Sequence, residues 1–143
     1  MLDMSQITAA TAELLQLKLD DYIIERNPLA PPESGKAAKA KAWVGVYRGR
    51  VTYTPARVGG AAKDAELEII LELQAVSLKN SAEAETKLSL AEKEILETLS
   101  ASRNLNNTVS FIKSYNVEYG LSKTGGAYFQ TAVITLTATA QVY

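Results

Sequence analysis

The chain has 143 residues and a formal net charge of -1, and it contains neither cysteine nor histidine. These absences exclude disulfides, thiolate zinc sites, cysteine nucleophiles and imidazole chemistry from this chain. The small net charge gives no overall field that would draw the protein to nucleic acid or to a membrane surface. Hydrophobic residues make up 47% and charged residues 22%, the balance of a globular protein. We therefore expect one domain over residues 1–143.

The N-terminal segment does not have the pattern of a targeting signal. Residues 1–10 lack a basic region and include Asp3, so we do not expect a signal peptide. No apolar run approaches the ~20 residues that are needed to span a bilayer. We expect a soluble protein that is made in the cytoplasm and does not bind membranes.

The first predicted element is an amphipathic helix over residues 5–25. Ile7, Thr11 and Leu14 follow a period near ~3.6, and Asp3 with Gln6 has the spacing of a capping box. Pro28 prevents continuation of the helix. We expect the apolar stripe to pack on the domain's own sheet, and a partner-docking face is the alternative.

A loop is predicted over residues 27–41, with the sequence NPLAPPESGKAAKAK. Its prolines favour an extended chain, and its lysines form a short basic tract. A loop of this length inside a compact domain is usually functional or mobile. Two interpretations stay open: an arm that orders against a partner or an acidic surface, and a solvated linker.

A strand is predicted over residues 43–53, WVGVYRGRVTY, because aromatic and β-branched residues favour a pleated surface. Alternation places Trp43, Gly45, Tyr47, Gly49, Val51 and Tyr53 on one face, and it places Arg48 and Arg50 together on the other. Gly45 and Gly49 indicate a bulge, a bend or a close backbone approach. The following segment, residues 55–63, reads as a turn with Gly59 and Gly60 at its tip, and it lacks the features of a phosphate-binding loop.

The clearest strand signal covers residues 65–76, where leucine, isoleucine and alanine alternate with Glu66, Glu68 and Glu72. Such alternation suits an antiparallel sheet with one buried face. A catalytic carboxylate pair needs a cause for perturbed pKa values, and no histidine, cysteine or apolar pocket is apparent near these glutamates. We expect a solvated face or a charged face between subunits.

The C-terminal half predicts a helix followed by a hairpin. Ala84, Leu88, Ala91, Ile95 and Leu99 form the apolar stripe of a helix over residues 82–101, with Asn80 or Ser81 as its N-cap. Asparagines in residues 103–108 favour left-handed turn geometry. Strands are predicted over residues 109–119 and 127–143, joined by residues 121–126. The last strand is far longer than the usual ~5–6 residues, and as an edge it would require a covering surface.

These elements predict an α+β fold. The order is one helix, several strands, one helix and a strand pair, which suits two helices against an antiparallel or mixed sheet of about four or five strands. No internal repeat or catalytic motif is present in the sequence.

The pattern resembles the tail terminator (tail completion, minor tail protein U-like) proteins of long-tailed bacteriophages. The features that carry the resemblance are the opening helix ITAATAELLQLKLDDYIIERNP, the strands WVGVYRGRVTY and AELEIILELQA, the helix AEAETKLSLAEKEILETLSAS, and the hairpin FIKSYNVEY and AYFQTAVITLTATAQVY. Together they span nearly the whole chain, and the long loop over residues 27–41 is the segment that matches least.

The resemblance implies a virion protein that forms a hexameric ring, caps the tail tube, stops its polymerisation and joins it to the head. It implies partners in further copies of the chain, in the tail tube protein and in a head–tail connector or neck protein. It implies neither catalysis nor a cofactor, and DNA would pass through the ring without specific recognition. For the docking contacts we expect basic side chains that meet acidic neighbours: Lys36, Lys39, Lys41, Arg48 and Arg50.

Three other interpretations remain open at the level of sequence. The chain would also suit another head–tail adaptor or a tail tube subunit, or a non-viral α+β module that binds a small ligand. A hydrolase using Glu66, Glu68 or Glu72 is the enzymatic alternative.

Overall fold

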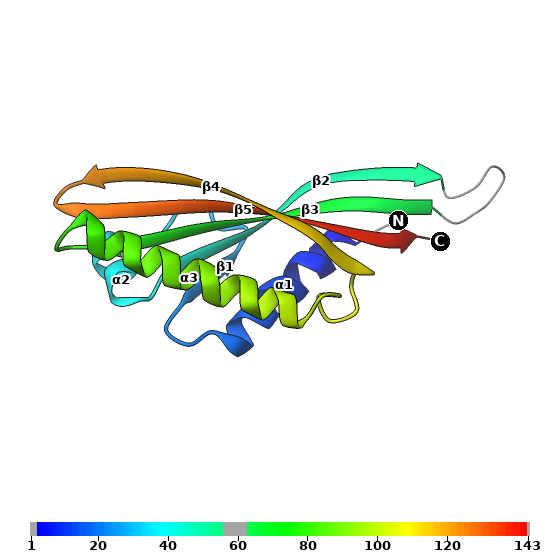
Figure 1. Ribbon diagram of the computed structural model, residues 1–143, viewed down its shortest axis with the longest axis horizontal. Helices are drawn as coiled ribbons and strands as arrows, with labels where there is room; N and C mark the ends of the chain where they lie inside the picture. The colour runs from blue at the N-terminus through cyan, green and yellow to red at the C-terminus, as the bar shows by residue number, and fades with distance from the viewer. Residues whose placement is uncertain (1–2, 56–62, 143) are drawn as a thin grey trace.

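The computed structural model describes residues 3–55 and 63–142 (Figure 1). Chain order is α1 (Met4–Lys18), β1 (Ile23–Arg26), α2 (Ser34–Lys39), β2 (Trp43–Pro55), β3 (Lys63–Ser77), α3 (Ser81–Ala101), β4 (Phe111–Thr124) and β5 (Ala127–Val142). The predicted α+β class is confirmed, and the six-residue α2 is an addition to the two expected helices.

The five strands form one mixed sheet in the order β1-β2-β3-β5-β4. The β1–β2 pair is parallel, and every other pair is antiparallel. The chain between β1 and β2 includes α2, because parallel neighbours need a crossover connection. Strand β3 therefore lies at the centre of the sheet, with β2 on one side and β5 on the other.

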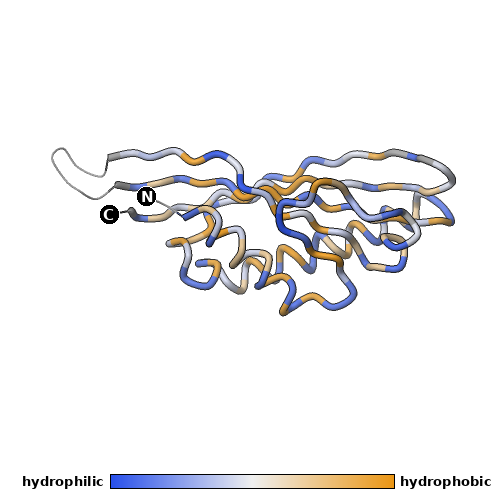
Figure 2. The backbone as a smooth tube through the Cα atoms, turned by 180° about the vertical axis from the view of Figure 1, so that it is seen from behind, coloured by the Kyte–Doolittle hydropathy of each residue, from blue (hydrophilic) through white to orange (hydrophobic). Residues whose placement is uncertain are grey.

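One face of the sheet carries the main core. Alternate residues of β3, Leu67, Ile69, Leu71 and Leu73, are completely buried with α1 and α3 packed against them. Burial of such a side chain contributes roughly 1.5–3 kcal/mol. In Figure 2 the strands show the corresponding alternation of apolar and polar residues along their lengths. The opposite side of the sheet, which α1 and α3 do not cover, is called the bare face below.

Helix α3 forms as the sequence predicts. Its buried residues are the five members of the predicted stripe. The Asn80 side chain accepts a hydrogen bond from the Glu83 backbone N–H at 2.8 Å, so Asn80 is the N-cap. At the start of α1, Asp3 accepts in the same way from the N–H of Gln6 at 3.1 Å.

The predicted end of the first helix is wrong. Helix α1 stops at Lys18, and Asp21 adopts a left-handed conformation with φ 64°. Ile23 and Ile24 then pair with Trp43 and Val44 as part of β1. These β-branched residues gain more as an added strand than as a further helical turn, because the edge of β2 offers them backbone partners.

A β-bulge in β2 overturns the faces predicted for residues 43–53, and a second bulge occurs in β4. The register of β2 shifts between Arg48 and Val51, and that of β4 shifts between Ile112 and Ser114. A bulge adds one residue to one strand, so every later side chain changes face. Val51 therefore lies opposite Leu67 on the core side, whereas Tyr47, before the bulge, lies opposite Ile70 on the bare face.

The long last strand was considered as an edge of the sheet, but β5 lies inside the sheet. Strand β5 pairs with β3 on one side and with β4 on the other, so β4 is the edge strand. The β4–β5 connection is shorter than predicted, with Gly125 and Gly126 at positive φ. Asn106 and Asn107 adopt the left-handed conformation predicted after α3. The predicted turn at Gly59 and Gly60 lies outside the described residues.

Truncation of Ile95 tests the packing of α3 on the sheet. Ile95 is fully buried in the main core, so Ile95→Ala should lower the free energy of unfolding by roughly 2–5 kcal/mol. Leu90→Ala on the same helix is the control, because Leu90 is 48% exposed and its loss should change stability by about 0.5 kcal/mol or less. Urea denaturation measures both changes, and equal effects would contradict the assigned packing.

Candidate interaction surfaces

The bare face is rich in threonine and glutamate. Strand β5 contributes alternate threonines to it, and β3 contributes the alternate polar residues between its core leucines. The members from these two strands are Glu66, Glu68, Ile70, Glu72, Gln74, Thr131, Val133, Thr135, Thr137 and Thr139. At one end α2 packs on this face, where Ala37 contacts a small cluster with Val76 and Ala127.

Two of the three glutamates that the sequence singled out are ion-paired. The Lys113 ammonium lies 3.0 Å from the Glu66 carboxylate, and the Arg50 guanidinium lies 3.6 Å from that of Glu68. Within the described residues no cluster of acidic side chains has the arrangement of a metal site. The structure therefore gives each of Glu66 and Glu68 a basic charge partner.

The third glutamate, Glu72, lies close to Tyr47. Burial raises the pKa of the Tyr47 phenol, and the negative charges of Glu72 and Glu25 raise it further. The Tyr47 hydroxyl donates a hydrogen bond to the Pro28 carbonyl at 3.3 Å. This contact ties the segment after β1 to the bare face beside Glu72.

The predicted basic contacts fall into two separate groups. Lys36 and Lys39 belong to α2, and Lys41 follows it. Helix α2 packs near Val76 of β3, whereas Arg48 lies opposite Ile69 in the register of the same strand. Seven residues of extended strand span about 23 Å, so the lysines and arginines do not form one site.

The two arginines also differ from each other. Arg50 reaches Glu68 on the bare face, while Arg48 pairs opposite Ile69, a residue of the core side. The prediction that they project together is wrong, because the bulge lies between them. Both side chains are exposed.

Lys41 takes part in a polar cluster between β1 and α3. Its ammonium lies 4.0 Å from the Glu94 carboxylate and 5.9 Å from the centre of the Tyr22 ring. The Tyr22 hydroxyl donates a hydrogen bond of 2.7 Å to Glu94. Burial is the main reason that the pKa of Tyr22 is raised, and the hydrogen bond to Glu94 adds to it.

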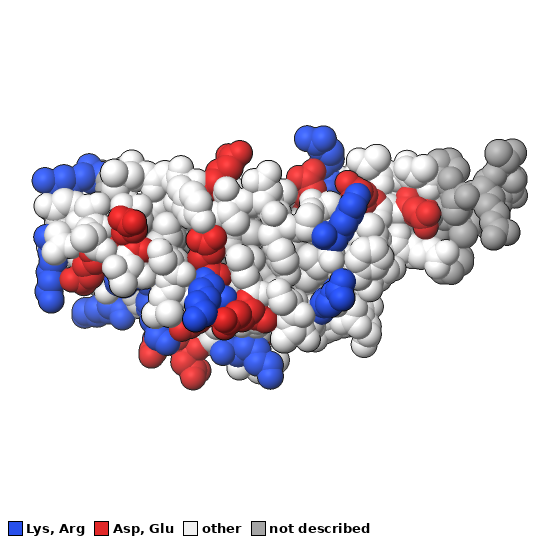
Figure 3. All heavy atoms as spheres, in the orientation of Figure 1, with Lys and Arg blue, Asp and Glu red and all other residues white. Residues whose placement is uncertain are grey.

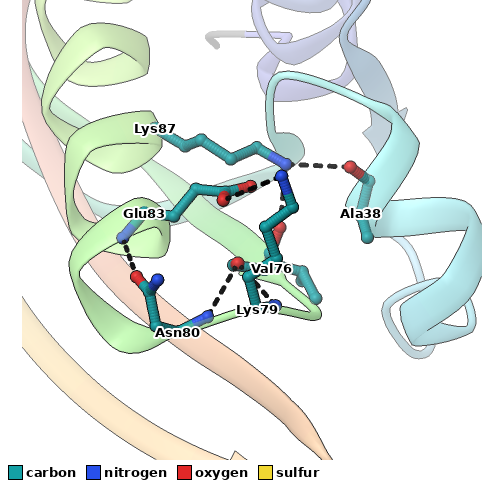
Figure 4. A network of polar contacts seen from close by, with 7 residues as sticks. Ala38, Val76, Lys79, Asn80, Glu83 and Lys87 are labelled. Atoms are coloured by element: carbon teal, nitrogen blue, oxygen red, sulfur yellow. Dashed lines mark hydrogen bonds and ion pairs between the residues drawn. The ribbon is translucent and has the colours of Figure 1, made fainter.

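Lys87 is a structural residue that the sequence did not reveal. From α3 its ammonium donates to the carbonyl oxygens of Ala38 at 2.9 Å and Val76 at 2.8 Å, as Figure 4 shows. Burial lowers the pKa of Lys87, and the nearby Glu83 opposes this effect. One side chain thus joins α3, the end of α2 and the end of β3. A lysine outside the apolar stripe of a helix has no distinguishing pattern in the sequence.

Three exposed apolar side chains lie along the edge strand. Tyr119 and Leu121 of β4 are 65% and 67% exposed, and Phe111 of the same strand is 45% exposed. The Tyr119 hydroxyl still donates to the Glu92 carboxylate at 2.8 Å. Charges of both signs are interspersed over the face seen in Figure 3 and form no single field there.

A groove of about 660 Å³ lies between α1 and α3. Leu14 and Leu19 contribute apolar surface to it, and Lys18, Lys41 and Glu94 contribute charge.

The described part of the chain contains no helix that is long and apolar enough to cross a membrane.

A scan against protein-family models found no match, and a search of curated proteins found no significant relative. Assignment of function therefore depends on the geometry of the molecule itself.

Replacement of Lys87 tests its role in holding α2. Lys87→Met should lower the free energy of unfolding by roughly 1–3 kcal/mol, because it removes the donor to two carbonyl groups. It should also speed hydrogen exchange at the Ala37 and Ala40 amides of α2. Lys93→Met, on an exposed position of α3, should leave both quantities unchanged. Unaltered exchange in the Lys87 variant would refute this role.

Replacement of Tyr22 tests the Glu94 cluster through its pH dependence. The pKa of Tyr22 is raised in the folded protein, so on raising the pH the phenol loses its proton first in the unfolded chain. The contribution of Tyr22 to the free energy of unfolding therefore declines as pH rises above about 10. Tyr22→Phe should therefore be less stable than wild type at pH 8 by about 1 kcal/mol, and the gap should narrow towards pH 11. Lys87, whose pKa is lowered by burial, also titrates in this range, but it is present in both proteins and so does not change the difference in stability between them. Urea denaturation across this range measures the gap, and a constant gap would contradict the assignment.

Proposed function

We propose that this protein is a self-assembling structural protein of a virion that resembles a phage tail terminator. Copies of the chain form a ring, in the family a hexamer, which caps the tail tube and stops its polymerisation. The ring then presents a surface to the head or neck. Its place is the head-proximal end of the tail, after assembly in the host cytoplasm.

The observation that carries the proposal is an incomplete sheet. Its four long strands have 13 to 16 residues, and the bare face is covered by a helix only at one end, where α2 packs near Val76. The edge strand β4 also exposes large apolar side chains. An exposed edge of this length is prone to pair with another chain, and soluble proteins normally protect it. Self-assembly gives the edge a partner.

The charge pattern favours assembly over hydrolysis. Glu66 and Glu68 are held by Lys113 and Arg50, which leaves no free carboxylate pair on this part of the bare face. The chain contains no histidine or cysteine to act as an alternative base or nucleophile. The exposed polar face suits contacts with other subunits and passage of a polyanion.

The basic residues retain a place in the proposal, although as two groups. Lys36, Lys39 and Arg48 form no ion pair within the described residues, and they are the strongest candidates for contacts with acidic neighbours. Lys41 and Arg50 have carboxylate partners within the chain, so their docking role would require a change of partner.

The particle mass of the purified protein tests the proposal. We expect a discrete oligomer of several subunits by light scattering, and isolated rings by negative-stain electron microscopy. Long tubes would identify a tube subunit instead, since tube proteins stack without limit. A monomer at high concentration would contradict the proposal and favour a small ligand-binding module.

The triple variant Lys36→Glu, Lys39→Glu, Arg48→Glu tests whether these basic residues make the docking contacts. It should keep the thermal stability of wild type, because all three side chains are exposed, and should lose association with an acidic partner component.

A further inference from the structure

The outer edges of β2 and β4 are each open over part of their length. Strand β1 covers the outer edge of β2 up to Val46, where the Asn27 N–H donates to the Val46 carbonyl. At the other edge, the Ile112 N–H donates to the Arg103 carbonyl, so the loop after α3 covers the start of β4. Within residues 3–55 and 63–142 no strand pairs with the outer edges of Tyr47–Thr54 or Ser114–Leu121. Unpaired backbone groups of this kind call for another extended strand.

The number of long strands decides how two copies would join. Strands β2, β3, β5 and β4 alternate in direction, so β2 and β4 run in opposite directions. When a second copy continues the sheet with its helices on the same side, its β2 meets β4 of the first copy in antiparallel orientation. This junction keeps the more stable of the two pairing patterns.

The side chains define a register for this junction. When Tyr53 of one copy lies opposite Tyr115 of the next, Val51 lies opposite Val117, and all four side chains point to the helix-covered side. On the bare face Thr52 then meets Asn116 and Thr54 meets Ser114. Aromatic and β-branched cross-strand pairs each contribute roughly 0.2–1 kcal/mol.

The charges agree with the same register. Arg50 follows in line opposite Glu118 of the next copy. Its side chain is 80% exposed on the bare face but lies 3.6 Å from Glu68 of its own chain, so a contact with Glu118 would require Arg50 to share or exchange its partner. Glu118 forms no ion pair within the described residues. Lys113 lies at the β4 bulge, where its own bond to Glu66 turns it away from the junction.

We propose that the outer edge of β2 in one copy pairs antiparallel with the outer edge of β4 in the next copy, with Thr52 opposite Asn116. This inference rests on the proposed self-assembly and identifies the surface that performs it. The contact is head-to-tail, so each copy uses both edges, and a closed ring leaves neither edge unpaired. A symmetric β4–β4 dimer would cover one edge only and would leave β2 open.

Engineered disulfides test the register, and the absence of native cysteine removes any background. In the full chain we would make Thr52→Cys with Asn116→Cys, both exposed positions. Opposed antiparallel residues have Cα atoms ~4.5–5.5 Å apart, within the range that a disulfide spans. Mild oxidation should give a covalent ladder that ends at the subunit number of the particle, and reduction should reverse it.

The control pair is Thr54→Cys with Glu118→Cys, which lies on the same two strands and the same face. In the proposed register these positions are offset by four residues, or about 13 Å, so they should not crosslink. The single variants of the test pair, Thr52→Cys and Asn116→Cys, should crosslink to each other when the two proteins are mixed, and neither should crosslink when oxidised alone.

Each other outcome overturns the inference. Oligomers of unchanged mass without a Thr52–Asn116 ladder would refute this junction and leave the proposed assembly intact. Crosslinking of Asn116→Cys alone would establish β4–β4 pairing in its place. A wild-type protein that stays monomeric at high concentration would refute the assembly and this junction together.

Discussion

The structure depends on the antiparallel pairing of β3 with β5. The two strands remain in register from Lys63 opposite Val142 to Ser77 opposite Tyr128, without a bulge. This unbroken ladder aligns the leucines of β3 with Ile134, Leu136 and Ala138 of β5 on a single face. Helices α1 and α3 then have one continuous apolar surface on which to pack, and the opposite face is left with threonines and glutamates. The buried layer and the bare face are therefore two consequences of one register.

The outer strands are less regular, and their irregularities determine which groups meet. Bulges in β2 and β4 reverse the orientation of later side chains, which separates Arg48 from Arg50 and turns Val51, Tyr53, Tyr115 and Val117 toward the helix-covered side. The crossover between β1 and β2 is held in place by the Tyr47 bond to Pro28 and by Lys87, so the lysines of α2 stay at one end of the molecule. Strand β1 and the loop after α3 also cover part of each edge, so only a portion of each outer strand has unpaired backbone. An edge that is open over a limited length suits a specific partner better than indiscriminate aggregation.

This arrangement connects the proposed function with the chemistry of the chain. On the bare face Glu66 and Glu68 form ion pairs with Lys113 and Arg50. What remains available is backbone hydrogen bonding along β2 and β4, a polar sheet face and a few unpaired basic side chains. A ring built through the sheet edges would use the backbone groups of β2 and β4. It would expose the polar sheet face to neighbouring subunits or to the channel, and it would leave the unpaired basic side chains for docking. The open edges are the feature of the described structure on which the proposed self-assembly rests.

The sequence by itself determined the α+β class, the core face of β3 and the apolar stripe of α3, and it narrowed the N-cap of α3 to Asn80 or Ser81. Each of these follows from a local period or spacing, and in each the local preference and the tertiary environment agree. Only the tertiary structure decided that residues 23–26 extend the sheet, since the edge of β2 supplies backbone partners that a helix would not need. It alone placed β5 inside the sheet and β4 at its edge, because strand order depends on pairings between distant segments. The sites followed the same division: the types of charged residue were readable, whereas their grouping depended on single-residue bulges and on a lysine that reaches two distant carbonyl groups, for which the sequence contains no periodic signal.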